Sequence, residues 1–126
     1  MNKKKKVPSP ADFARAKAAM REDDRGLSEV CERILSRFGN KNLHEFYLLY
    51  SSNANSFGAY TFYETAAQVD KFSKNGQSEE IKNAVYEELD SVGRGNREEI
   101  TVNFYFDNHE DVVRNFEGNY HSRLYS

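Results

Sequence analysis

The chain has 126 residues, 38% of them hydrophobic, and a formal net charge of −2, which favours one folded domain with a single core. No apolar run approaches the roughly 18 residues of a membrane-spanning helix, so we expect no membrane partner. A single cysteine cannot form an internal disulfide, and no apolar run follows the basic N-terminus. Both observations favour a cytoplasmic protein.

Four consecutive lysines, Lys3–Lys6, lie in a tail over residues 1–9 that we expect to be disordered, ahead of a single domain over residues 10–126. Without these lysines the chain holds 14 basic and 20 acidic residues, a net charge of −6. An acidic body repels nucleic acid and attracts basic partners, so we predict no direct nucleic-acid partner. An adaptor that binds nucleic acid through Lys3–Lys6 is the least favoured hypothesis.

Two helices are predicted in the N-terminal third. Ser9 is a suitable cap for a helix over residues 11–22, which has a thin apolar face. In "GLSEVCERILSRFG" six apolar residues recur at helical spacing from Leu27 to Phe38, and Gly39 is a typical helix stop. Cys31 lies on this apolar stripe, so we interpret it as a buried small residue rather than a nucleophile.

A hairpin and a further helix are predicted next. "LHEFYLLYSS" (43–52) and "FGAYTFYET" (57–65) have the composition of strands and are joined by a short polar turn. Residues 69–77 contain an Asn-Gly turn signal and are expected to form a connecting loop. "SEEIKNAVYEELDSVG" (78–93) predicts a helix that Ser78 caps, with one apolar face and one acidic face.

The C-terminal quarter is predicted to form a second hairpin. "EITVNFYFD" (99–107) alternates between apolar and polar residues as a half-buried strand does. Residues 112–117 are expected to be its return strand, and residues 119–125 a short edge strand. This order predicts an α+β fold, in which an antiparallel sheet of about four to five strands has helices packed on one face.

The tip of the second hairpin holds the densest group of reactive side chains, Asp107, His109, Glu110 and Asp111. Asp and Asn favour turns because their side chains bond nearby amides. A metal or acid–base site needs ligands that converge from several elements, whereas adjacent tip residues fan outward. The turn is the favoured interpretation. The alternative is a small metal-binding or hydrolytic domain that uses Asp107, His109, Asp111 and His121, which a divalent-metal stability screen would test.

No cofactor is predicted. The chain lacks a phosphate-binding P-loop, a dinucleotide fingerprint, a Cys-x-x-Cys pair and a Gly-x-Ser-x-Gly elbow. "VGRGNRE" (92–98) has two glycines and two arginines, but a phosphate-binding loop precedes a helix and this one follows it. We therefore expect a protein that is not an enzyme.

The pattern over residues 40–126 resembles small immunity proteins of bacterial polymorphic-toxin and contact-dependent growth inhibition systems. The resemblance lies in the hairpin "EFYLLYSS…AYTFYET", the helix "IKNAVYEEL", the strand "ITVNFYFD" and the ending "NFEGNYHSRLY". It implies a cytoplasmic inhibitor that binds one cognate toxin domain, often a nuclease, and blocks its active site or substrate surface. A nuclease attracts phosphate and tends to be basic, which suits an acidic binder rich in tyrosine.

The expected contact surface combines acids from the third helix and the hairpin tip with tyrosines on exposed sheet positions. Alternation along the strands assigns these positions, and a one-residue error in register would reverse them. The residues are Tyr60, Tyr63, Glu87, Asp90, Tyr105, Asp107, Glu110, Asp111 and Tyr120.

If the hairpin tip presents its acids to a basic toxin, changing Glu110 and Asp111 to Lys should lower the affinity for the toxin. The salt dependence of binding should weaken, because fewer charge pairs form across the interface. The free energy of unfolding should hardly change, since turn acids face solvent. Binding measured over a range of salt concentrations, together with urea unfolding, checks both expectations.

Overall fold

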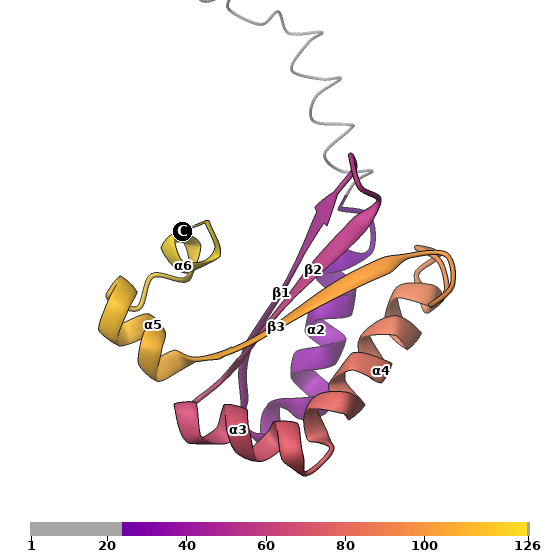
Figure 1. Ribbon diagram of the computed structural model, residues 1–126. Helices are drawn as coiled ribbons and strands as arrows, with labels where there is room; N and C mark the ends of the chain where they lie inside the picture. Colours follow the sequence, from indigo (N-terminus) through magenta and orange to yellow (C-terminus); the bar gives the residue numbers. More distant parts are fainter. Residues whose placement is uncertain (1–23, 126) are drawn as a thin grey trace, which may run out of the picture.

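A three-stranded sheet organises residues 24–125, which are the residues that the computed structural model describes. β1 (Leu43–Ser51), β2 (Ser56–Tyr63) and β3 (Thr101–Asn108) lie in this order across the sheet (Figure 1). β1 and β2 form an antiparallel hairpin, whereas β3 pairs with β2 in parallel. The central strand, β2, therefore contacts both of the others along its whole length.

The α+β class is confirmed, but the prediction of an antiparallel sheet of four to five strands is wrong. The chain between β2 and β3 forms two helices, α3 (Ala66–Lys74) and α4 (Gln77–Ser91). This helical crossover returns the chain to the end of the sheet at which β2 began, so β3 runs parallel to β2. The C-terminal segment adds no strand, because it forms α5 (His109–Phe116) and α6 (Tyr120–Leu124).

Helix caps explain why residues 109–124 are helical and do not form the predicted hairpin tip, return strand and edge strand. The side chain of Asn108 accepts a hydrogen bond from the backbone N–H of Asp111 at 2.9 Å, so Asn108 is the N-cap of α5. Glu110 and Asp111 then lie in the first turn, where the helix dipole favours negative charge. Asn119 caps α6 in the same way through the N–H of Ser122.

Residues 69–77 were predicted to form a connecting loop, but residues 66–74 form the helix α3. A cap at Thr65 explains why this segment is helical. The side chain of Thr65 accepts a hydrogen bond from the N–H of Gln68, and the side chain of Gln68 accepts one from the N–H of Thr65, so the two form a capping box. Phe72 of this helix is buried in the core. The predicted cap Ser78 is also wrong, because α4 begins one residue earlier and buries Ser78 in its first turn.

The two helices with the clearest periodicity match their predictions. α2 (Leu27–Phe38) buries four apolar side chains along the predicted stripe. Gly39 is not the left-handed stop that was predicted, because its φ is −58° and it begins a 3-10 turn at Gly39–Lys41; the left-handed residue is Asn42. α4 buries the predicted apolar face and ends at the predicted loop. The helix expected over residues 11–22 and the tail over residues 1–9 lie outside the described residues.

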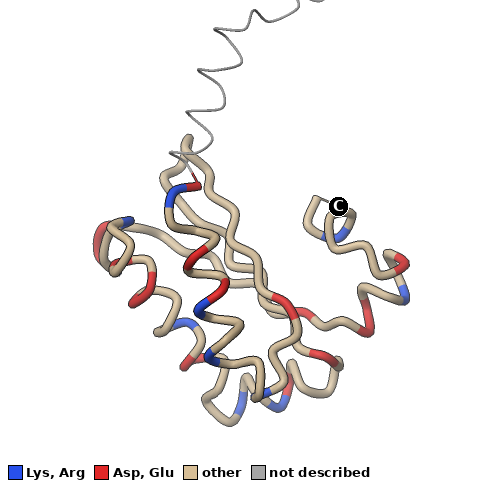
Figure 2. Tube along the Cα trace, turned by 180° about the vertical axis from the view of Figure 1, so that it is seen from behind, with Lys and Arg blue, Asp and Glu red and all other residues tan. Residues whose placement is uncertain are grey.

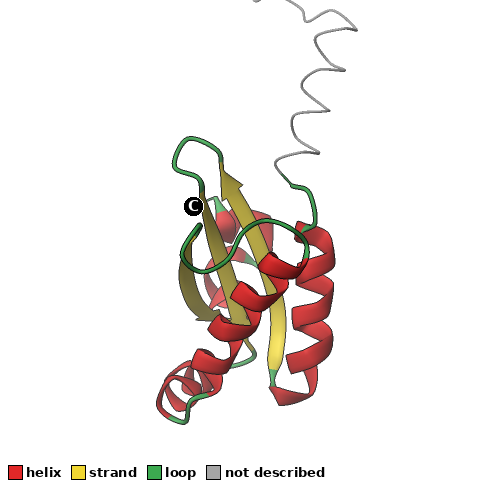
Figure 3. Ribbon diagram, turned by 90° about the vertical axis from the view of Figure 1, so that its right-hand side faces the viewer, coloured by secondary structure: helices red, strands yellow, loops and turns green. Residues whose placement is uncertain are grey.

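α2 and α4 lie side by side on one face of the sheet, and the core fills the space between them and the strands (Figures 1 and 3). The largest side chains that are fully buried there are Tyr63, Ile34, Phe38, Phe46, Phe57, Ile81 and Leu89. Burial of apolar surface at roughly 25 cal/mol per Å² makes this contact the main source of stability.

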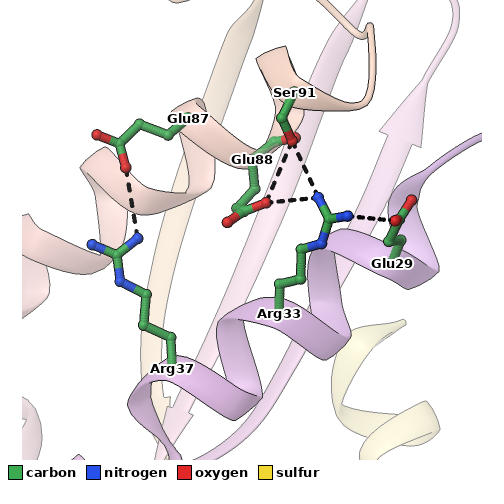
Figure 4. A network of polar contacts seen from close by, with 6 residues as sticks. All are labelled: Glu29, Arg33, Arg37, Glu87, Glu88 and Ser91. Atoms are coloured by element: carbon green, nitrogen blue, oxygen red, sulfur yellow. Dashed lines mark hydrogen bonds and ion pairs between the residues drawn. The ribbon is translucent and has the colours of Figure 1, made fainter.

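Charged side chains join the solvent sides of α2 and α4 (Figure 4). Arg33 donates to Glu88 Oε1 at 3.0 Å and to Ser91 Oγ at 3.2 Å, and it also pairs with Glu29. Arg37 pairs with Glu87 at 3.6 Å. Because these side chains are largely exposed, each pair is expected to add less than about 1 kcal/mol to the contact between the helices.

Two substitutions on the buried face of β2 should change stability in opposite directions. Among the described residues, Thr61 Oγ1 is a buried polar atom without a hydrogen bond, whereas Tyr63 Oη bonds the buried Ser78 Oγ at 2.8 Å. Thr61→Val should raise the free energy of unfolding by about 1 kcal/mol, and Tyr63→Phe should lower it by about 1–2 kcal/mol. Urea unfolding measures both, and a shift of the same sign in both variants would contradict this account.

Candidate functional site

The face of the sheet opposite α2 and α4 carries a row of three tyrosines, one from each strand. Tyr60 of β2 lies directly opposite Tyr47 of β1 and Tyr105 of β3. The rings of Tyr60 and Tyr105 are stacked, with centroids 4.8 Å apart and planes 18° apart. Tyr105 is 46% exposed, so the end of this stack is open to solvent.

Two further rows flank the tyrosines and complete what we call the open face. The strand register sets the members of each row. On one side Gly58 separates Leu49 from Asn103, and on the other Phe62 separates Glu45 from Asp107. The nine residues of the open face are Glu45, Tyr47, Leu49, Gly58, Tyr60, Phe62, Asn103, Tyr105 and Asp107.

Gly58 determines how the Tyr60 ring lies on the open face. A Cβ atom built on Gly58 would lie 2.9 Å from Cε2 of Tyr60, which is closer than real Cβ contacts. The ring of Tyr60 therefore occupies the space that any other residue at position 58 would fill. Gly58 thus leaves room for this ring, and Tyr105 stacks against it.

The row of Phe62 is covered by the last helix of the chain. Tyr120 meets the Phe62 ring edge-on, with centroids 4.9 Å apart. Arg123 Nε donates to Asp107 Oδ2 at 2.7 Å, and its guanidinium lies 5.9 Å from the centroid of the Phe62 ring. Burial, followed by the charge of Glu45, raises the pKa of Tyr120 well above its ordinary value, so this phenol stays neutral.

Two histidines meet at the same end of the sheet. His44 at the start of β1 contacts His109 at the start of α5, with ring centroids 4.1 Å apart. His109 Nδ1 lies 2.7 Å from the Tyr120 hydroxyl. A register irregularity between Leu43 and Glu45 accompanies this contact. Their separation of 65 positions gives no sequence signal that the two histidines meet.

Four of the nine predicted contact residues come together at the open face. Tyr60, Tyr105 and Asp107 belong to it, and Tyr120 covers its edge. The exposure predicted for Tyr63 is wrong, because Tyr63 is 0% exposed and lies on the core face. Tyr60 and Tyr63 are three positions apart, and strand side chains alternate, so the two must point to opposite faces. Sequence reasoning missed Gly58, Phe62 and Arg123.

The other predicted acids lie elsewhere. Glu87 and Asp90 lie on α4, which packs on the face of the sheet opposite the tyrosine row. Together with Asn83, Tyr86, Asn96 and Arg97 they line a shallow surface cavity of about 410 Å³. Figure 2 shows that the helices carry most of the charged residues, while the strands carry few. The predicted surface is therefore divided between two sides of the molecule.

Glu110 and Asp111 were predicted at an exposed hairpin tip, but both make hydrogen bonds within the fold. Glu110 Oε1 accepts a hydrogen bond from the N–H of Ala66 at 2.9 Å, at the beginning of α3. The N–H of Glu110 donates to the carbonyl of Glu64 at 3.2 Å. Asp111 accepts from the Asn108 side chain at 3.0 Å and pairs with Arg114. The two acids thus connect α5 to α3 and stabilise its first turn.

The alternative metal or hydrolytic cluster is not assembled. Asp107 pairs with Arg123, His109 contacts His44 and Tyr120, and the ring of His121 contacts that of Tyr125 at a tilt of 45°. Within residues 24–125 no group of three or more His, Cys, Asp and Glu is placed to hold a metal ion.

Cys31 has the properties of a packed thiol. It is partly buried against the core, as its place on the helical stripe predicts. Burial raises the pKa of the Cys31 thiol to about 11, although a backbone hydrogen bond at Leu48 acts in the opposite direction. At neutral pH very little thiolate is present, which does not favour a nucleophilic role.

Because Glu110 bonds the start of α3, its change to Lys should affect the free energy of unfolding, contrary to the expectation from the sequence. Glu110→Lys removes the acceptor for Ala66 and places a positive charge in the first turn of α5. The free energy of unfolding should fall by about 1–2 kcal/mol. Glu98→Lys, a reversal at an exposed loop position, is the matched control and should change it by less than about 0.5 kcal/mol. Equal effects in urea unfolding would show that the Glu110 contact contributes nothing.

Comparison of the chain with known protein families, with curated proteins and with solved structures gives no match. Among the helices that the structure describes, none combines the length and apolar character needed to cross a membrane. What the open face can bind must therefore be inferred from its own side chains.

Proposed function

We propose that this chain is a binding protein of the immunity type, which neutralises a cognate toxin domain by covering its active site or substrate surface. The observation that carries the proposal is the stack of Tyr60 and Tyr105 on the open face. The expected toxin is basic, with a nuclease as the favoured class, and the expected location is the cytoplasm.

The tyrosine row has the properties of an interface centre. Tyrosine gives a large contact area with few rotatable bonds, and it is enriched among residues that dominate binding energy. Tyr105 is 46% exposed and stacks on Tyr60, so a partner could contact the open end of an aromatic stack. These residues support the proposal without requiring any chemistry from the chain.

Charge supports a basic partner. Residues 24–125 contain 11 basic and 17 acidic residues, a net charge of −6. On the open face itself the two ionisable carboxylates, Glu45 and Asp107, lie at one edge of the tyrosine row. A domain that binds nucleic acid presents positive charge, so long-range attraction would speed its association with this chain.

The proposal predicts that the two stacked tyrosines dominate binding. Tyr60→Ala and Tyr105→Ala should each weaken the affinity for the toxin domain encoded beside this chain about 30-fold. Val113→Ala is the control, because Val113 of α5 is 51% exposed and lies outside the open face, and it should change the affinity less than about threefold. Calorimetric titration gives the affinities, and circular dichroism checks that each variant is folded.

A cellular assay tests the inhibitory role directly. Cells that express the toxin domain should survive when they also express the wild-type chain or Val113→Ala, but not when they express the double variant of Tyr60 and Tyr105. Failure of the wild-type chain to bind the toxin or to protect the cells would overturn the proposal. Protection by the double variant would show that a different surface binds.

A further inference from the structure

The row of Phe62 already holds a guanidinium group. Phe62 lies between the carboxylates of Glu45 and Asp107 in the strand register. The guanidinium of Arg123 lies over the ring and pairs with Asp107, with side chains only 25% and 21% exposed. An aromatic ring between two carboxylates suits a planar cation, which can stack on the ring and donate to an acid.

The segment that supplies this arginine is held by side-chain contacts, chiefly those of Tyr120 with Phe62 and His109 and of Arg123 with Asp107. We call residues 117–125 the C-terminal flap. Its helix has five residues, none of them buried. The flap begins at Glu117 and Gly118, which have positive φ values of 53° and 79° and are exposed. α5 is held more firmly, because Val112 is fully buried and Glu110 bonds the start of α3.

We propose that the Phe62 row is an arginine-acceptor site, which Arg123 occupies in the free protein and an arginine of the partner occupies in the complex. The identity of the partner rests on the proposed function; the acceptor site itself does not. When the flap lifts, the tyrosine row and the Phe62 row become one continuous contact surface.

Charge balance explains why the replacement must be cationic. Removal of Arg123 leaves Glu45 and Asp107 beside an apolar ring with no positive charge between them. Asp107 would keep only the hydrogen bonds that it accepts from Asn108. A partly buried carboxylate without an opposite charge is costly, so a neutral side chain would not stabilise the open flap. A guanidinium restores the pairing with Asp107 and the contact with Phe62. An ammonium group lacks the planar form that stacks on a ring.

Occupation of the site by Arg123 should also lower the apparent affinity of the chain for its partner. A site that the chain itself fills is available to a partner only for the fraction of time that the flap is open. Weakening the flap should therefore strengthen partner binding, whereas removing the carboxylate should weaken it. A flap that only stabilises the fold would not raise affinity when it is weakened.

The first experiment tests the site without the partner, using the full chain and N-ethylguanidinium as the probe. Arg123→Ala should bind the probe saturably at millimolar concentration, as followed by NMR shifts at Asp107 and Phe62, whereas the wild-type chain should bind at least tenfold more weakly. N-ethylammonium should bind more weakly than N-ethylguanidinium. If Arg123→Ala is poorly folded, Arg123→Gln, which keeps the length and polarity of the side chain, replaces it.

Double variants supply the controls. Adding Asp107→Asn to Arg123→Ala should abolish probe binding, and adding Glu98→Gln should leave it unchanged. Two results would overturn the proposed acceptor site. One is that the Asp107→Asn double variant binds the probe as tightly as Arg123→Ala alone. The other is that neither Arg123→Ala nor Arg123→Gln binds the probe saturably.

The second experiment uses the toxin domain. Arg123→Ala should bind it several-fold more tightly than the wild-type chain, and Asp107→Asn about tenfold more weakly. If the toxin binds all three chains equally, the inference fails while the proposed function stands. If the toxin binds none of them, the proposed function fails, and the guanidinium experiment alone decides whether the acceptor site exists.

Discussion

The register of β2 against its two neighbours is the constraint on which both the core and the open face depend. Each residue of β2 faces one partner on β1 and one on β3, so the register aligns Tyr60 with Tyr47 and Tyr105. A slip of one residue on either side would put tyrosines into the core and break the row. Burial of Phe57 and Ala59 on the other face fixes the register, because both would become exposed by the same slip.

Sequence patterns predicted the long elements of the fold and failed at the short ones. α2, α4 and the three strands follow periodicities that persist over eight or more residues. The helices over 66–74, 109–116 and 120–124 are shorter than α2 and α4, and their main signals are the caps at Thr65, Asn108 and Asn119. Asparagine and aspartate favour turns as well as helix starts, so a cap without a long apolar stripe is ambiguous. This ambiguity also led to the wrong strand count and direction.

The candidate site was predictable only where it depends on alternation along one strand. The exposure of Tyr105 follows from the period of β3, whereas the same reasoning was misapplied to Tyr63. The Phe62 row could not be predicted, because it joins residues from three strands and covers them with Arg123 from a helix that had been expected as a strand. Long-range contacts of this kind depend on topology. The helix between β2 and β3 was predicted, but it was not recognised as a crossover that makes the two strands parallel.

The absence of a side chain at Gly58 has a consequence for the energetics of recognition. Because the Tyr60 ring lies over Gly58 and against Tyr105, its rotamer is already restricted before any partner arrives. Ordering a free side chain at an interface costs about 0.5–1.5 kcal/mol, and here that entropy is lost during folding instead. The centre of the open face is thus preorganised for binding, whereas the C-terminal flap beside it would have to move when a partner binds.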